Sequence, residues 1–219
     1  MLHVVALPIG NLEDITLRAI SLLKNADIII GEERRELIPL LKHFEVDIHS
    51  KDLEFLNEHS DKEDLLHLKN LCKERNVVLV SDCGTPVFCD PGSSLIALCR
   101  KENIAVKTAP GASSLMSLLS LSSQKISQFH FAGFLPREKD ERMKEIKKLS
   151  QSKASFIVMD TPYRLKATIN QLALVMPSRK ALLGCDLTFE HELVLEDTLS
   201  KINSQIKDGD KKEFIVLVY

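Results

Sequence analysis

The chain has 219 residues, of which 44% are apolar and 27% are charged. It is long enough for one large domain or two smaller domains, each with a buried core. The 29 Lys and Arg residues nearly balance the 31 Asp and Glu residues, which gives a formal net charge of −2. This balance argues against binding to nucleic acid or anionic lipid through overall charge, so any contact with RNA must come from a local patch.

The apolar runs and the cysteines indicate the compartment. No apolar run approaches the roughly 20 residues that a membrane-spanning helix needs, and the first residues lack the charged and then apolar pattern of a leader. The five cysteines form no Cys-x-x-Cys pair and no zinc pattern with nearby histidines. The sequence therefore predicts a cytoplasmic protein with reduced thiols, no membrane span and no metal.

The first half of the chain alternates strand and helix patterns. An apolar run at 2–7 ends at a Pro8–Asn11 turn, after which Asp14 is placed to cap a helix. Further strands are expected at 27–30, 77–80 and 104–107, and further helices at 63–74, 92–101 and 112–121. This alternation is typical of an α/β domain built on a mostly parallel sheet.

A polar segment at 122–125 indicates a domain boundary, and strands are less evenly separated by helices beyond it. The expected strands lie at 129–134, 155–159, 180–185, 192–195 and 214–219. Five strands with about three helices predict a mixed sheet. The predicted domains are residues 1–123 and 124–219.

Three loops that follow strands and precede helices are candidates for ligand binding. They cover residues 8–11, 81–92 and 110–114, and such loops gather at the carboxyl ends of parallel strands. The middle loop is rich in Gly, Pro and Asp and too long for a tight turn. In the third loop Gly111 permits close approach to a ligand, and the residues after it present amides at a helix start. Turn chemistry alone is the alternative explanation for these residues.

Several motifs, in order along nearly the whole chain, resemble those of the tetrapyrrole methylase superfamily, most closely its branch of small-subunit ribosomal RNA methyltransferases. They are Leu7-Pro8-Ile9-Gly10-Asn11-Leu12, Ser81-Asp82-x-Gly84-Thr85-Pro86 with Asp90-Pro91-Gly92, Pro110-Gly111-x-Ser113, Gly133-Phe134-Leu135-Pro136-Arg137, Thr161-Pro162-Tyr163-Arg164-Leu165, Leu187-Thr188 with His191-Glu192, and Glu213-Phe214-Ile215-Val216. Any one of these motifs would be a weak signal, but together they are specific.

The resemblance implies two α/β domains with S-adenosylmethionine bound in the cleft between them, and commonly a homodimer. By motif position, the first-domain residues beside the cofactor would be Pro8, Gly84, Thr85, Phe88, Ser113 and, at the start of the next helix, Ser114. Asp160 and Leu187 of the second domain fall where the family closes the adenine side. For these two residues, a strand-end carboxylate and a core leucine are equally good explanations.

The catalytic candidates come from the chemistry of methyl transfer to a ribose hydroxyl. The protein must align two reactants and help to remove a proton from a poor nucleophile. Glu32, after the second strand, is the first candidate for this base, and Asp82 is the second. Arg35 could hold a phosphate beside the target ribose. The family usually has Glu-Asp-Thr-Arg where this chain has Glu32-Glu33-Arg34-Arg35, and a solvated charged helix start is an equally good explanation of this segment.

Two further features could contact RNA. The segment 137–153 has an excess of Lys and Arg, but it also reads as an ordinary exposed amphipathic helix with Met143, Ile146 and Leu149 facing the core, and that interpretation is favoured. Tyr163 and Phe88 are the aromatic residues best placed to stack on a base or on adenine.

The predicted function is S-adenosylmethionine-dependent 2′-O-methylation of a cytidine in small-subunit ribosomal RNA. One alternative is methylation of a tetrapyrrole or another small molecule. The other is a cofactor-binding protein that has lost catalysis, which the changed residues Glu33 and Arg34 would permit.

Overall fold

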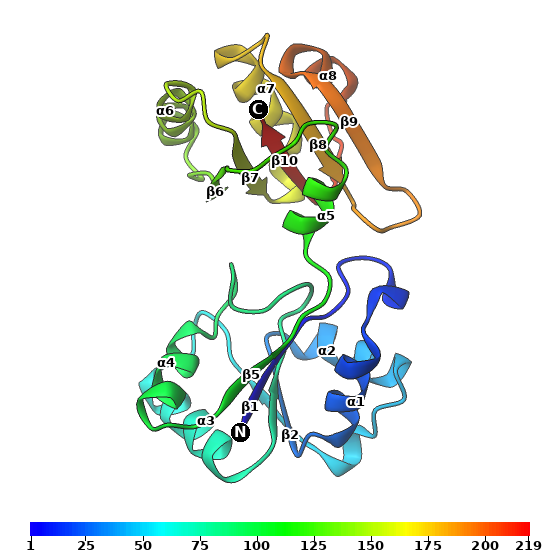
Figure 1. The fold of residues 1–219 in the computed structure, drawn as a ribbon, viewed down its shortest axis with the longest axis vertical. Coiled ribbons are helices and arrows are strands. Elements are labelled where there is room, and N and C mark those ends of the chain that lie inside the picture. The colour runs from blue at the N-terminus through cyan, green and yellow to red at the C-terminus, as the bar shows by residue number, and fades with distance from the viewer. The chain divides into compact units, whose positions relative to one another are not determined.

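Five parallel strands form the sheet of the N-terminal unit. The computed structural model describes residues 1–219 and divides into two units, Met1–Ser113 (unit 1) and Ser114–Tyr219 (unit 2) (Figure 1). The strands of unit 1 are β1 (Leu2–Val5), β2 (Ile28–Gly31), β3 (Asp52–Phe55), β4 (Val77–Leu79) and β5 (Val106–Ala109), in the order β3-β2-β4-β1-β5. All neighbouring pairs are parallel, as the alternating pattern predicted.

Helices cover both faces of this sheet (Figure 1). They are α1 (Leu17–Asn25), α2 (Arg34–His43), α3 (Lys62–Glu74) and α4 (Ser93–Lys101). Ile29 of β2 belongs to the core cluster with α1 and α2, whereas its neighbours Ile28 and Ile30 belong to the cluster with α3 and α4. Successive strand residues thus point to opposite buried faces, which is why β2 is an unbroken apolar run.

The order of the strands places two loops at a switch point. The connection from β1 leads to β2 on one side, and the connection from β4 leads to β5 on the other side, while β1 and β4 are neighbours. In open α/β sheets, ligands bind outside the carboxyl ends of the strands at such a reversal. The loops after β1 and β4 therefore occupy the position in unit 1 where this fold binds ligands.

Unit 2 contains a mixed sheet, as predicted. Its strands are β6 (His130–Phe134), β7 (Phe156–Asp160), β8 (Lys180–Cys185), β9 (Leu193–Thr198) and β10 (Phe214–Val218), in the order β6-β7-β10-β8-β9. The β6–β7 pair is parallel and the other pairs are antiparallel. Helices α6 (Lys139–Ser150), α7 (Leu165–Val175) and α8 (Leu199–Gln205) share one core with Phe156 and Val158 of β7.

Helix α5 (Ser114–Ser120) packs against the sheet of unit 2. A Cβ atom at Gly184 of β8 would lie 3.0 Å from Leu118 Cδ1, so the absence of a side chain there lets the helix approach the sheet. The predicted boundary at 123/124 lies after α5, whereas the two units divide before it. The polar segment at 122–125 is an internal turn of unit 2, where the Ser122 hydroxyl lies 2.9 Å from Tyr219 Oη.

Two local features differ from the sequence-based expectations. The short strand β3 was not expected because Asp52-Leu53-Glu54-Phe55 has few apolar residues, as suits a strand at the sheet edge. The N-cap of α1 is Thr16, whose hydroxyl accepts from the Ala19 amide at 3.1 Å, and Asp14 lies instead in a preceding 3₁₀ turn, Leu12–Asp14. Further 3₁₀ turns span Ile48–Ser50 and Pro162–Arg164.

None of the helices is long and apolar enough to cross a membrane. No group of three or more His, Cys, Asp or Glu side chains is arranged to hold a metal ion.

Candidate functional site

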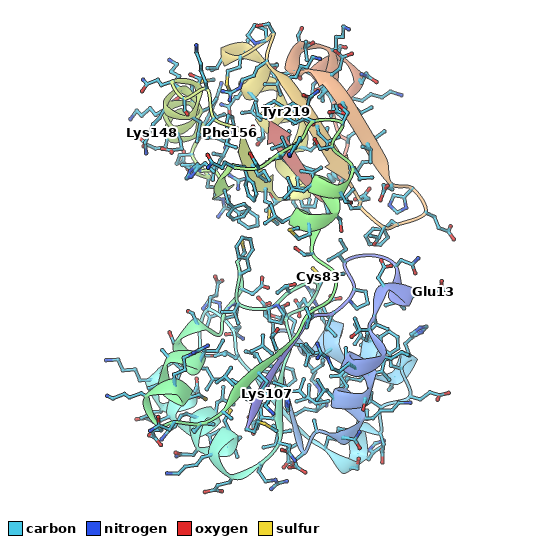
Figure 2. All side chains as sticks on the ribbon, viewed as in Figure 1. Glu13, Cys83, Lys107, Lys148, Phe156 and Tyr219 are labelled. Atoms are coloured by element: carbon cyan, nitrogen blue, oxygen red, sulfur yellow. The ribbon has the colours of Figure 1, made fainter.

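Hydrogen bonds join the three predicted loops of unit 1 at the carboxyl ends of β1, β4 and β5. The Leu7 amide donates to the Gly84 carbonyl at 2.8 Å, and the Gly84 amide donates to the Pro8 carbonyl at 3.3 Å. The Thr85 hydroxyl donates to the Ala112 carbonyl at 3.1 Å. In Figure 2, Cys83 of the middle loop lies at this end of the sheet, away from Lys107 near the start of β5. The structure therefore places Pro8, Gly84 and Thr85 together at this end of the sheet.

Two glycines permit this close approach of the loops. Gly84 has a φ of +68°, and a Cβ there would lie 3.1 Å from Ile9 Cγ2. A Cβ at Gly111 would lie 3.0 Å from the Ala6 Cβ. Side chains at these positions would push the loops apart. Glycine loses more conformational entropy on folding than other residues, but here it allows the loops to pack closely.

The β4–α4 loop also contains a strained residue. Val87 has a φ of +75°, which is rare for a β-branched residue and costs about 1–3 kcal/mol. Such outliers concentrate at ligand sites, because they persist only where the surrounding structure imposes them. Phe88 follows directly, and about half of its surface is exposed.

Three carboxylates gather beside these loops. Glu32 follows β2, and Asp82 and Asp90 lie in the β4–α4 loop. The pKa of Glu32 is raised by partial burial and by the negative charges of Asp82 and Asp90, although a backbone hydrogen bond from Asp82 opposes the shift. Burial likewise raises the pKa of Asp82 and of Asp90. A carboxylate whose pKa is raised toward neutrality is a stronger base, which suits Glu32 to the predicted role.

Asp82 also makes a hydrogen bond to the backbone at the start of α2. Its Oδ1 accepts from the Glu33 amide at 3.1 Å, and this bond serves the first turn of α2, whose N-cap Glu33 makes no side-chain cap of its own. Asp82 thereby ties the β4–α4 loop to the start of α2. The Arg35 side chain is exposed and pairs with Glu36 at 3.2 Å, so it remains accessible to a phosphate from solvent.

The remaining predicted residues lie elsewhere in the chain. Ser113 is the last residue of unit 1, and Ser114 begins α5 in unit 2. Asp160 is the last residue of β7, and Leu187 follows β8. Ser113 and Ser114 are both partly exposed, whereas Asp160 and Leu187 are buried.

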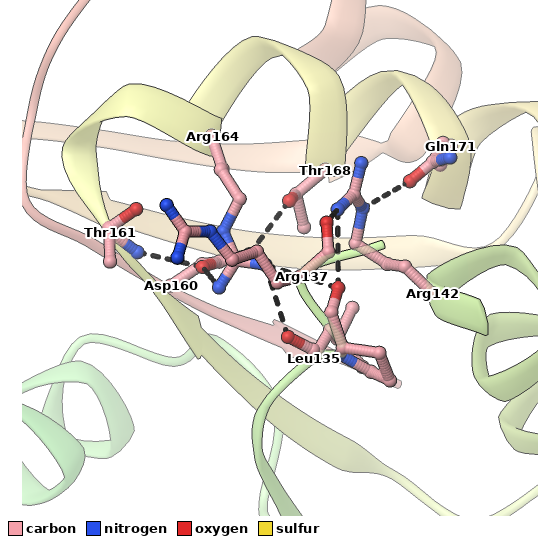
Figure 3. Close-up of polar contacts among 9 residues, drawn as sticks. Leu135, Arg137, Arg142, Asp160, Thr161, Arg164, Thr168 and Gln171 are labelled. Carbon is pink, nitrogen blue, oxygen red and sulfur yellow. Dashed lines mark hydrogen bonds and ion pairs between the residues drawn. The ribbon is translucent and has the colours of Figure 1, made fainter. Parts of the chain in front are cut away.

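Asp160 is the centre of a buried network (Figure 3). Its Oδ1 accepts from the Thr161 amide at 2.8 Å and pairs with the Arg164 guanidinium, while its Oδ2 accepts from the Thr168 hydroxyl at 2.9 Å. Arg164 also donates to the Leu135 carbonyl at 3.1 Å. Both carboxylate oxygens are thus occupied within unit 2, which favours the strand-end carboxylate explanation for this side chain.

Leu187 lies in a strained turn. Asp186 and Thr188 on either side have φ values of +48° and +71°, and Asp186 is held by Lys212 Nζ at 2.7 Å and by the Glu213 amide at 3.0 Å. A Cβ at Gly184 would lie 2.9 Å from Leu187 Cδ2, so Leu187 packs back on its own strand. The positive φ values, which the sequence did not reveal, add to the motif resemblance that already made this turn a functional candidate.

The basic segment 137–153 is mainly helix α6, as the favoured interpretation held. Arg142 is buried and donates to the Pro136 and Arg137 carbonyls at 3.2 and 2.8 Å. Lys144 and Lys148 pair with Glu141 and Glu145 on the same helix. Arg142 is therefore a structural residue that fixes the loop after β6, as Arg164 does from the other side (Figure 3).

Sequence reasoning missed two participants. Asp90 was seen only as part of a motif, although its charge contributes to the raised pKa of Glu32. Arg164 was also seen only as part of a motif, and its contact with Asp160 follows from their i, i+4 spacing across a turn. That spacing is the signal that could have revealed the pair.

Comparisons with known proteins identify the family. Residues 1–203 match the model of the tetrapyrrole (corrin/porphyrin) methylases. The chain is 42% identical over 216 residues to ribosomal RNA small subunit methyltransferase I of Rickettsia prowazekii, covering 98% of this chain and 71% of the relative. It is 36% identical over 218 residues to the protein of that name from Halalkalibacterium halodurans, covering 99% and 75%.

A solved structure shares the fold. It is uroporphyrin-III C-methyltransferase from Thermus thermophilus complexed with S-adenosylhomocysteine, with a TM-score of 0.62, 14% sequence identity, and coverage of 99% of this chain and 96% of that chain. The order of the motifs, the two sheets and the relatives agree: the chain belongs to the tetrapyrrole methylase family and is a methyltransferase that uses S-adenosylmethionine.

Proposed function

We propose that this protein methylates small-subunit ribosomal RNA, and that the acceptor is the 2′-hydroxyl of a cytidine, as the motif resemblance implies. The observation that carries the proposal is the 34–42% identity, over nearly the whole chain, to relatives named for this RNA. The cytoplasm, where ribosomal RNA is assembled into subunits, is the compartment we propose for the reaction.

The loops of unit 1 are the cofactor site that we propose. S-adenosylmethionine, when bound, supplies an electrophilic methyl group. The backbone at Pro8, Gly84 and Ser113 is the part of the chain that we propose to hold it, because the loops meet at the switch point and two glycines keep their backbone bare. Thr85 and Phe88 would line the same site from the β4–α4 loop.

The carboxylates beside these loops supply the protein chemistry. We propose that Glu32 accepts the proton of the ribose hydroxyl and that Arg35 holds a neighbouring phosphate. The burial and negative neighbours that raise the pKa of Glu32 make its ionised form a better base. Asp82 keeps the start of α2, and hence Glu32 and Arg35, next to the β4–α4 loop.

A tetrapyrrole or other small-molecule acceptor is the weaker candidate. The family description favours it, but solved structures whose names specify such a substrate are only 14–17% identical to this chain. The relatives named for ribosomal RNA are more than twice as similar.

Replacing Ser113 with Phe is expected to abolish cofactor binding, because a large ring at this loop would fill the backbone cradle. Calorimetry with S-adenosylhomocysteine should show saturable binding to the parent protein and none to Ser113→Phe. Equal circular dichroism and melting of the two proteins would show that the fold is retained. If Ser113→Phe binds as tightly as the parent, the cofactor lies elsewhere.

A map of ribose methylation tests the acceptor. Ribosomal RNA from cells that lack the gene should lose the mark on one cytidine of the small subunit, and a plasmid copy should restore it. An unchanged map would contradict the RNA assignment and favour a small-molecule acceptor or a protein without activity.

We also propose a homodimer, on the resemblance to the family alone. Light scattering over a concentration series should give about twice the 24.6 kDa mass of one chain. A constant mass of one chain throughout the series would contradict it.

A further inference from the structure

Three exposed aromatic side chains lie at one edge of the unit 2 sheet. Phe134 ends β6, Tyr163 lies in the turn after β7, and Phe189 lies in the loop after β8, with exposed fractions of 50%, 79% and 40%. The edge is shared because β6 runs parallel to β7, and because Phe214 at the start of β10 pairs with both Asp160 and Cys185 at the ends of β7 and β8. We call these three side chains the aromatic rim.

Lys211 contacts Tyr163, and His191, which pairs with Asp186 at 3.3 Å, contacts Phe189. Lys211 Nζ lies 5.2 Å from the centre of the Tyr163 ring and forms no ion pair with a carboxylate. The His191 ring lies 5.3 Å from the Phe189 ring, at 40° to it. Arg137, three residues after Phe134, is exposed and uses only its backbone carbonyl within the protein. Lys211 is therefore a cation without a carboxylate partner beside an exposed ring, and Arg137 is an exposed cation close to Phe134 in the sequence.

This composition favours unpaired nucleotides as the ligand. Bases that are not in a helix stack on aromatic side chains, while nearby Lys and Arg bind the phosphates. The strands β6, β7, β10 and β8 are successive neighbours, and at about 4.8 Å per strand the rim extends over roughly 14 Å, on the order of a few nucleotides.

The alternative basic surface is less suitable. On α6, Arg142 is buried, and Lys144 and Lys148 already pair with Glu141 and Glu145. The helix also presents no exposed aromatic residue for a base. A cation at the rim is more available than most cations of α6, although the rim has fewer of them.

We propose that the aromatic rim, with Arg137 and Lys211, binds single-stranded nucleotides of the RNA substrate by stacking. This inference rests on the proposed RNA methylation and specifies which face of unit 2 recognises the RNA. It requires the acceptor region to be presented unpaired, since base faces inside a duplex are covered.

The test uses fluorescence anisotropy with a labelled, cytidine-rich RNA oligonucleotide, single-stranded or annealed to its complement. Tyr163→Ala should weaken binding of the single strand by about 5- to 150-fold, the effect of losing one stacked base. Tyr163→Phe should retain parental binding because it keeps the ring. Leu174→Ala is the matched control, since Leu174 is also a highly exposed apolar residue, at 66%, but lies near the far end of α7. The parent should bind the duplex more weakly than the single strand.

Tyr163 could instead stack on the adenine of the cofactor, so the affinity for S-adenosylhomocysteine is measured as well. If the ring stacks on RNA, this affinity should be the same in all variants. The inference is overturned if Tyr163→Ala binds single-stranded RNA like the parent, if it loses the cofactor product instead, or if the duplex binds as tightly as the single strand. A parent protein that binds no single-stranded RNA would also overturn it, whereas the methylation map decides the proposed function separately.

Discussion

Glu32→Gln is expected to lower turnover on the authentic RNA by about 10²- to 10⁴-fold, the usual contribution of a general base. The amide keeps the shape of the side chain but cannot accept the proton. Affinity for S-adenosylhomocysteine should change little, because the backbone of the loops is the proposed cofactor site. Single-turnover methylation with radiolabelled cofactor would measure the effect.

The pH dependence gives this prediction a second readout. Glu32 must be ionised to act as a base, so the activity of the parent should fall as the pH drops through the pKa of this residue. Burial and the charges of Asp82 and Asp90 raise that pKa above the ordinary value, so the fall should begin at a higher pH than for an unperturbed glutamate. This acidic limb should be absent from the residual activity of Glu32→Gln.

Arg35→Ala is the contrasting variant. It should chiefly weaken RNA binding, and its contribution should shrink at higher salt, where phosphate contacts are already screened. A Glu32→Gln enzyme with parental turnover would remove Glu32 from the mechanism and leave Asp82, or alignment of the reactants alone, as the explanation.

The same carboxylate should reduce stability. A group whose pKa is higher in the folded protein than in the unfolded chain binds its proton more tightly when folded, so stability falls as the pH rises between the two values. At neutral pH the ionised Glu32 therefore destabilises the fold. Glu32→Gln should raise the free energy of unfolding slightly, by no more than a few tenths of a kcal/mol, because the group is only partly buried. Its melting temperature should therefore be slightly higher than that of the parent. Lower activity with higher stability is typical of a functional residue.

The sequence predicted the sheets well because their signals are local. The apolar run at 28–30 is buried on both faces, and such a run indicates a parallel strand without further information. The edge strand β3 and the cap at Thr16 were missed, since a polar edge strand is defined by its neighbours and Thr16 competes with the equally suitable Asp14. The assignment of α5 to unit 2 depends on its packing against β8 and β10, which no local pattern encodes.

The candidate site was predictable only where residue type determines backbone shape. Gly111 indicated close approach to a ligand, which stays a prediction, and the structure packs Gly84 and Gly111 closely against Ile9 and Ala6. The positive φ at Val87 and Thr188 could not be read from the sequence, because neither residue type favours it. Likewise, the mixed charges of the sequence did not reveal which cations have partners within the protein. Arg142 and Arg164 bind backbone carbonyls, whereas Lys211 contacts only the Tyr163 ring and no carboxylate.

Asp160→Ala is expected to lower the free energy of unfolding by about 3–5 kcal/mol, the usual cost of removing one partner of a buried ion pair. The carboxylate is fully buried, and its loss leaves the Thr161 amide, the Thr168 hydroxyl and the Arg164 guanidinium without their acceptor. Arg164 also holds the loop after β6, so the defect should spread to that loop (Figure 3). Urea unfolding followed by circular dichroism would measure the loss.

Asp197→Ala is the matched control for this prediction. Asp197 lies on the surface but has a similar set of contacts. It accepts from the following backbone amide at 2.7 Å and forms an ion pair with Lys201, four residues later. Solvent replaces the lost contacts there, so its unfolding midpoint should move much less. Asp160→Asn, which keeps the acceptor oxygen but removes the charge, should fall between the two. Equal midpoints for Asp160→Ala and Asp197→Ala would show that the buried network does not stabilise unit 2, and a contact with the cofactor would then be the better explanation of Asp160.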